Sequence, residues 1–167
     1  MKNKKFKVND HGVCVEPTSH TIYKADDKGW CDHLIIRVGE HEGKWSGGYN
    51  FSFGYSGCSC PVTFDPKFSK LFKTEASCLK YWIDHFISDY KNKNRRMRSN
   101  ITRNKNRILK EKGQKHLDKI LATDNGYRKV VKQIKFNEFL IEQLEEYLDT
   151  YGGASRRLAL YDKRKTA

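Results

Sequence analysis

The chain has 167 residues, of which 37% are hydrophobic and 32% are charged, and 33 lysines and arginines against 20 acidic residues give it a net charge of +13. This apolar fraction excludes a wholly disordered chain, and no run approaches the roughly 20 apolar residues of a membrane span. Five cysteines, an odd number, favour reduced thiols over a disulfide framework, and the basic N-terminus lacks the apolar segment of a signal peptide, so we expect a cytoplasmic protein.

The first part of the chain has the alternating pattern of an antiparallel sheet. Residues 34–38 alternate in period 2, a polar turn follows over 39–43, and residues 45–54 then alternate aromatic residues with glycine, serine and asparagine. Such a pattern predicts a β-hairpin with a packed aromatic face and a second face that is open or closely approached by backbone. With short extended pieces before it and one more strand over 58–64, we expect a sheet of four or five strands.

A long helix is predicted next. Thr74 is a favourable N-cap before Glu75, and an apolar stripe at helical spacing continues without a break over 79–108. The stripe predicts one helix over 75–112, about 55 Å long, that ends at Gly113. Several asparagines in its second half are weak helix formers, which predicts a helix that frays in the middle until a partner binds.

Two further helical segments complete the chain. The first is short and lies around 117–121, and a turn at 124–126 separates it from a helix over 127–151 that is antiparallel to the long one. The Gly152-Gly153 pair should end that helix.

Charge divides the chain unevenly. Residues 1–66 have no net charge, whereas residues 67–167 account for the whole +13. An asymmetry of this kind favours a polyanionic partner for the basic part. We therefore expect an α+β chain in three parts: a neutral β-rich part (1–73), a basic helical part packed on it (74–153) and a basic mobile tail (154–167).

The densest charge lies on the predicted long helix. Residues 91–115 hold eleven lysines and arginines against a single acidic residue, Glu111, whereas a solvated helix usually mixes both signs. Arginine matches phosphate oxygens with two parallel hydrogen bonds, and asparagine donates to phosphates or reads base edges. The side opposite the apolar stripe is therefore a candidate nucleic-acid-binding surface. Its candidate residues are Lys91, Lys93, Arg95, Arg96, Arg98, Asn100, Arg103, Asn104, Lys105, Arg107 and Lys110.

Other sites are less well supported by the sequence. The hairpin aromatics Trp45, Tyr49, Phe51, Phe53 and Tyr55 would stack on single-stranded bases if exposed, but their period favours a buried face.

A zinc ion is the one cofactor to weigh. The pairs Cys31–His33 and Cys58–Cys60 could hold a tetrahedral zinc if their strands were neighbours, although the C-x-C spacing differs from the usual C-x-x-C, so we expect no cofactor. No nucleophile elbow, P-loop, zinc-protease motif or carboxylate cluster is present, and His20 and His41 are typical of solvated histidines. The sequence therefore predicts a protein that is not an enzyme.

Residues 34–87 resemble a small β-hairpin-plus-helix module that occurs in proteins of phages and plasmids. The features that carry the resemblance are Gly43, Trp45, Gly54, Gly57, Pro61 and the helix start at Thr74. The resemblance implies an origin in a mobile element and supplies no catalytic residues.

Two hypotheses for function remain open. In the first, the protein is an accessory protein of a phage or plasmid that binds DNA, RNA or a nucleoprotein complex through the basic helix. In the second, it is a phage-encoded inhibitor, anti-CRISPR-like, that binds a host protein or a host-defence nuclease complex by occupying its nucleic-acid-binding or anionic groove. A membrane partner is not expected, because the narrow apolar stripe is needed for the core.

Overall fold

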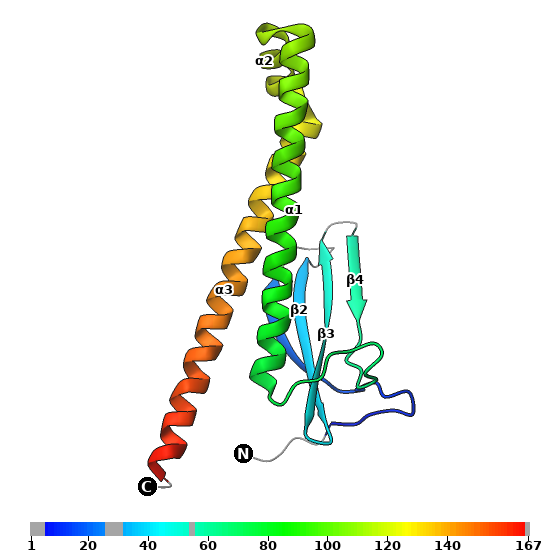
Figure 1. The fold of residues 1–167 in the computed structure, drawn as a ribbon, viewed down its shortest axis with the longest axis vertical. Helices are drawn as coiled ribbons and strands as arrows, with labels where there is room; N and C mark the ends of the chain where they lie inside the picture. Colours follow the sequence, from blue (N-terminus) through cyan, green and yellow to red (C-terminus); the bar gives the residue numbers. More distant parts are fainter. Residues whose placement is uncertain (1–5, 26–31, 54–55, 166–167) are drawn as a thin grey trace. The chain divides into compact units, whose positions relative to one another are not determined.

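The computed structural model describes residues 6–25, 32–53 and 56–165, with side chains up to Tyr151 (Figure 1). Four strands come first: β1 (Thr18–Lys24), β2 (His33–His41), β3 (Lys44–Phe53) and β4 (Ser56–Cys60). Three helices follow: α1 (Glu75–Lys112), α2 (Gln114–Thr123) and α3 (Asn125–Lys165). The predicted α+β class, with an N-terminal antiparallel sheet followed by a long helix, is confirmed.

The chain divides into two compact units. The sheet unit comprises residues 1–85 and 143–167, and the hairpin unit comprises residues 86–142. Both boundaries fall inside helices, because α1 and α3 each contribute residues to both units. The three-part division expected from charge and composition stays a prediction.

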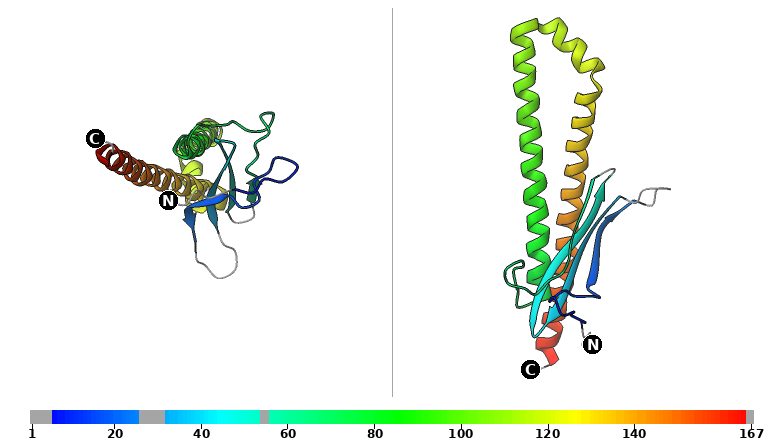
Figure 2. Two further views of the ribbon diagram at one scale, coloured as in Figure 1. Left: turned by 90° about the horizontal axis from the view of Figure 1, so that it is seen from below. Right: turned by 90° about the vertical axis from the view of Figure 1, so that its right-hand side faces the viewer.

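The sheet has the simplest antiparallel order, β1-β2-β3-β4 (Figure 2). On the central strand β2, Leu34, Ile36 and Val38 are fully buried, as their alternation predicts. Leu34 pairs with Phe51 and Ile36 with Tyr49 across the ladder. Since directly opposed residues of an antiparallel pair point to the same side, the aromatic residues of β3 share the face that carries the core.

The hairpin turn is shorter than the sequence suggested. A five-residue turn over 39–43 is wrong, because the ladder continues to the pair His41–Lys44. Only Glu42 and Gly43 remain in the turn, and both have positive φ, 51° and 73°. Two consecutive positive φ values define the type I′ turn, whose twist matches that of the strands it joins.

The aromatic face of β3 meets the first turns of α1. Gly47 leaves space for the indole of Trp82, which would overlap any Cβ at that position, and Tyr49 contacts the same indole with ring centroids 5.3 Å apart. Tyr49, Phe51 and Phe53 form a stack with centroid distances of 6.0 and 5.9 Å. These aromatics are half-buried, so neither full burial nor full exposure describes them. Tyr55 lies outside the described residues.

The opposite face of the sheet is closely approached by backbone, the second of the two arrangements expected for it. Ser46 is fully buried, and its hydroxyl donates to the carbonyl oxygen of Thr63 and lies 2.6 Å from the hydroxyl of Ser69. The strand expected over 58–64 ends at Cys60, because Pro61 has no N–H for the ladder.

Helix α1 follows the prediction at both ends. The hydroxyl of Thr74 accepts the backbone N–H of Ser77 at 3.2 Å, and Gly113, with a φ of 77°, stands just after the last helical residue. Leu79 and Ile83 are fully buried. One uninterrupted helix over 75–112 is therefore confirmed.

Helix α3 differs from the prediction at both ends. The carboxylate of Asp124 accepts the N–H groups of Gly126 and Tyr127 at 2.7 and 3.3 Å, so the helix begins at Asn125 and the expected turn is its N-cap. The end expected at Gly152-Gly153 is wrong, since α3 continues to Lys165. Each glycine costs about 1 kcal/mol in a helix interior, which the strong helix formers after residue 153 offset. The side chains of the predicted basic tail lie outside the described residues.

Candidate nucleic-acid interface

The hairpin unit consists of the second half of α1, α2 and the first part of α3. Two sets of contacts establish that α1 and α3 are antiparallel here. Asn94, early in this part of α1, contacts Ile134 and Asn137, whereas Lys105, eleven residues later, contacts Tyr127. The predicted antiparallel partner helix is therefore present.

A buried amide pair joins the two helices. Asn94 donates from Nδ2 to the carbonyl oxygen of Ile134 at 3.2 Å, and Asn137 donates from Nδ2 to Oδ1 of Asn94 at 2.7 Å. Gln133 in turn donates to Oδ1 of Asn137 at 3.0 Å. The two asparagines are only 6% and 3% exposed. The asparagine that counted against a stable helix in the sequence thus has a defined place in its packing.

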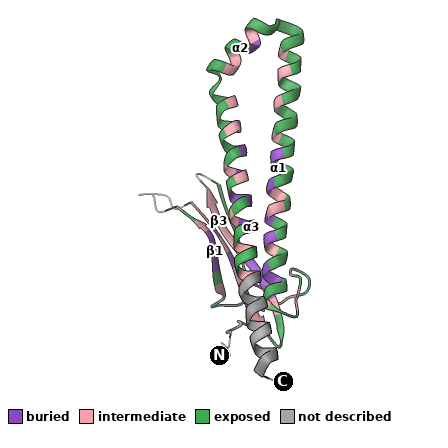
Figure 3. Cartoon of the chain, turned by 90° about the vertical axis from the view of Figure 1, so that its left-hand side faces the viewer, coloured by how far each residue is buried: buried purple, intermediate pink, exposed green. Residues whose placement is uncertain are grey.

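Four basic residues form a row on the outer side of α1 (Figure 3). Arg96, Arg103, Arg107 and Lys110 are all exposed, and we call them the basic row. At 100° per residue they fall within an arc of about 60°, and they span about 21 Å along the helix axis. Within the described part of the chain, none of the four has a hydrogen bond or a carboxylate partner. Their charge is therefore free to meet a partner.

Three other predicted contact residues do not lie on that open surface. Arg98 forms an ion pair with Glu138 at 2.5 Å, and Lys105 is half-buried with its ammonium 5.2 Å from the ring centroid of Tyr127. Placing both of them opposite the stripe was wrong, because each lies about 60–80° from its centre and so faces the side of α3. Lys93 pairs with Asp89 at 2.7 Å.

The remaining candidates differ in their surroundings. Lys91 and Arg95 are exposed, and Arg95 lies on the flank of α1 about 60° from Lys110. Asn100 and Asn104 are exposed as well, but they also line a cavity. The structure thus separates the eleven predicted residues into an open basic row with its neighbours, paired cations, and amides beside a cavity.

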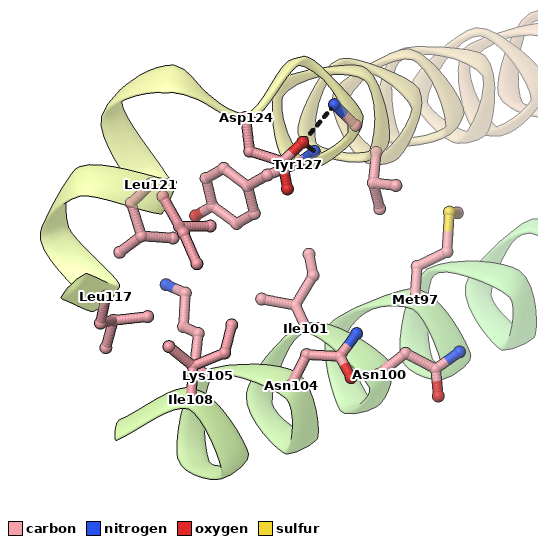
Figure 4. Close-up of a pocket in the computed structure, with 13 residues that line it drawn as sticks. Met97, Asn100, Ile101, Asn104, Lys105, Ile108, Leu117, Leu121, Asp124 and Tyr127 are labelled. Carbon is pink, nitrogen blue, oxygen red and sulfur yellow. Dashed lines mark hydrogen bonds between the residues drawn. The ribbon is translucent and has the colours of Figure 1, made fainter. Parts of the chain in front are cut away.

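That cavity lies between α1, α2 and the start of α3, and it has a volume of about 300 Å³ (Figure 4). Ile101 and Lys105 extend from α1 into it, facing Tyr127 and Leu121. Its lining is otherwise mostly apolar, with Met97, Ile108, Leu117, Ile120 and Val130. Sequence patterns gave no indication of it, because it exists only where three helices meet.

The electrostatics of the unit are one-sided. Residues 86–142 hold sixteen lysines and arginines against six acidic residues, a net charge of +10. Burial, and to a lesser degree the charge of Asp89, raises the pKa of Tyr90, so this hydroxyl stays neutral. The acidic residues Asp89 and Glu138 already form ion pairs, which leaves the basic row uncompensated.

The zinc hypothesis fails on its geometric condition. His33 is on β2 and Cys58 and Cys60 are on β4, with β3 between them, so the strands are not neighbours. Cys31 lies outside the described residues. Burial, and then Cys58, raises the pKa of Cys60, which opposes the thiolate that zinc requires. Among described residues, no three histidine, cysteine or acidic side chains are close enough to hold a metal.

A second polar cluster, which the sequence did not reveal, lies in the sheet unit. His20 is buried, with Nδ1 2.9 Å from the hydroxyl of Tyr147 and Nε2 3.3 Å from a carboxylate oxygen of Glu75. Treating His20 as solvated was therefore wrong. Its partners come from α1 and α3, more than fifty residues away in sequence. The cluster connects β1 to both helices and has the character of a structural network.

No known family accounts for the chain. No protein-family model matches it, and neither the curated proteins nor the solved structures contain a significant match. In the described residues, no helix is long and apolar enough to cross a membrane.

Proposed function

We propose that the protein binds nucleic acid through the basic row on α1 and catalyses no reaction. The observation that carries this proposal is the set of exposed cations Arg96, Arg103, Arg107 and Lys110 on one side of one helix, without carboxylate partners in the described residues. Guanidinium groups bind phosphate oxygens in a bidentate manner, so a row of them suits a phosphate backbone.

The dimensions support the same partner. The row extends about 21 Å along α1, and B-DNA places one phosphate about every 3.4 Å of helix axis on each strand. A strand aligned with the helix therefore offers several phosphates within reach of the row. With Arg95 added, about five contacts predict a slope of log K against log salt near −4.5 for duplex DNA and −3.5 for a single strand.

The test is a fluorescence anisotropy titration with labelled single- and double-stranded DNA and RNA over a salt series. The decisive variant changes Arg96, Arg103 and Arg107 to Gln. Loss of three contacts should reduce the slope for duplex DNA by about 2.7 and weaken binding about a hundredfold near 0.15 M salt.

A matched control removes the same charge from α3 instead. Lys129, Lys132 and Lys135 are exposed there, and changing all three to Gln should weaken binding by about tenfold or less. Equal losses in both variants would contradict a specific role for the row.

Weak binding by the wild type, shared by the row variant, would sink the proposal. The row would then be tested against the alternative partner, a preformed host protein or nucleoprotein complex. Capture of such a complex that resists competitor DNA, and that depends on the three arginines, would support the inhibitor hypothesis.

A further inference from the structure

The cavity in the hairpin unit opens beside the basic row. Asn100 and Asn104, which line it, lie on α1 between the row and the apolar stripe. At 100° per residue they follow Arg107 by about 20° and 60°, toward the side where Ile101 enters the cavity. In sequence they alternate with the row: Arg96, Asn100, Arg103, Asn104, Arg107. A strand held by the row would therefore pass directly along the cavity.

The cavity has the composition of a ligand site. Its volume of about 300 Å³ is at the lower end of the range for small-molecule sites, about 300–1,000 Å³, and it combines apolar walls with few polar groups. Such a volume suits one heterocyclic ring system better than a large ligand. Tyr127 supplies an aromatic ring, and Leu121 and Ile101 supply apolar surface (Figure 4).

The polar groups at the cavity fit a base more closely than a hydrocarbon. An asparagine amide both donates and accepts, which allows it to pair with the edge of a base. Lys105 is half-buried in the lining, and within the described residues it has no carboxylate partner. Asp124, also in the lining, already uses Oδ1 to cap α3. A buried cation beside apolar walls favours a ligand that brings acceptor atoms, such as base carbonyl or phosphate oxygens.

We infer that this cavity accepts one unpaired nucleobase of a strand whose phosphates lie on the basic row. The inference rests on the proposed function and adds to it a preference for single-stranded over double-stranded nucleic acid. The base contacts the apolar walls and Tyr127, Asn100 and Asn104 meet its edge, and Lys105 meets its carbonyl or phosphate oxygens. An unpaired base enters without the cost of breaking a base pair.

The experiment compares two single-stranded DNA oligonucleotides of equal length and charge, one complete and one with abasic positions at its centre. Anisotropy gives their affinities over the same salt series, and a 2-aminopurine at the centre of the complete strand reports the surroundings of the base. We expect the wild type to bind the complete strand about tenfold more tightly, as base contacts of this kind contribute. The 2-aminopurine emission should change on binding.

Two variants leave the net charge and the basic row unchanged. Asn100→Ala with Asn104→Ala removes exposed amides and should fold normally, and Leu121→Trp fills the cavity. Both should reduce the tenfold preference toward one while the salt slope stays the same. Circular dichroism will identify a Leu121→Trp protein that fails to fold, and the Asn100 and Asn104 variant then decides the question.

The outcomes separate the two proposals. Salt-dependent binding of both strands with equal affinity would overturn the base site and leave the basic row standing. A preference that survives in the Asn100 and Asn104 variant would likewise overturn it. Failure of both strands to bind would overturn the proposed function and the base site together.

Discussion

Replacing Asn94 by alanine tests how the two helices of the hairpin unit are held in register. In the wild type, Oδ1 of Asn94 accepts the N–H of Asn137 at 2.7 Å, and its Nδ2 donates to the carbonyl oxygen of Ile134 at 3.2 Å. The alanine removes both partners. The amide N–H of Asn137, whose side chain is 3% exposed, then has neither that acceptor nor ready access to water.

The expected magnitude follows from these contacts. A buried donor left unsatisfied costs about 1–3 kcal/mol, and alanine returns up to about 0.7 kcal/mol because it is the better helix former. Asn94→Ala should therefore lower the free energy of unfolding by about 1–2 kcal/mol. Asn137→Ala should have a similar effect, since it removes the same interaction from the other side.

The double variant is the sharper measurement. Once Asn94 is absent, removing Asn137 also removes the unsatisfied donor, so the combined loss should be smaller than the sum of the single losses by about 1 kcal/mol. Replacing both residues by leucine should be neutral or stabilising, because an apolar pair needs no hydrogen bond.

Urea unfolding of the wild type, the two single variants and the double variant provides the free energies, with far-UV circular dichroism following the helices. Tryptophan fluorescence provides a separate probe, because Trp45 and Trp82 belong to the sheet unit. Single losses below about 0.5 kcal/mol, or strictly additive losses in the double variant, would refute the argument.

Two further predictions concern the sheet unit. Gly47→Ala should lower the free energy of unfolding by about 1–3 kcal/mol, because its Cβ would overlap the indole of Trp82; an unchanged Tm would contradict this packing. Burial, and then the charge of Glu75, raises the pKa of Tyr151 to about 12 and also raises the pKa of Tyr147. An unfolded tyrosine ionises near 10, so this stabilisation is complete below pH 10 and is lost as the pH rises through the folded pKa. Changing both tyrosines to Phe should remove that alkaline loss, measured by circular dichroism; an identical loss would assign it to other groups.

Local signals account for the successes of the sequence analysis. The cap at Thr74, the apolar stripe and Gly113 predicted α1 with its ends, because each acts within a few residues of its own position. The weaker results occur where local signals compete. Two glycines predicted the end of α3, and the helix-forming residues after them outweighed that cost.

The candidate interface shows the same limit. Its helix and its charge density were predictable from residues 91–115, since both depend on composition and helical period. The partners of individual side chains were not predictable. Arg98 meets a carboxylate forty residues away, and Asn94 finds its amide partner at a similar separation. Nothing within one turn of either residue indicates such a contact.

The sequence by itself thus determined the α+β class, the long helix and the concentration of positive charge on it. The tertiary structure alone decided which cations stay open, which asparagine is buried and where a cavity forms between α1, α2 and α3. The physical reason is the range of the interactions. Capping, helical period and net charge are properties of neighbouring residues, whereas ion pairs, buried amides and cavities depend on chain segments that only folding brings together.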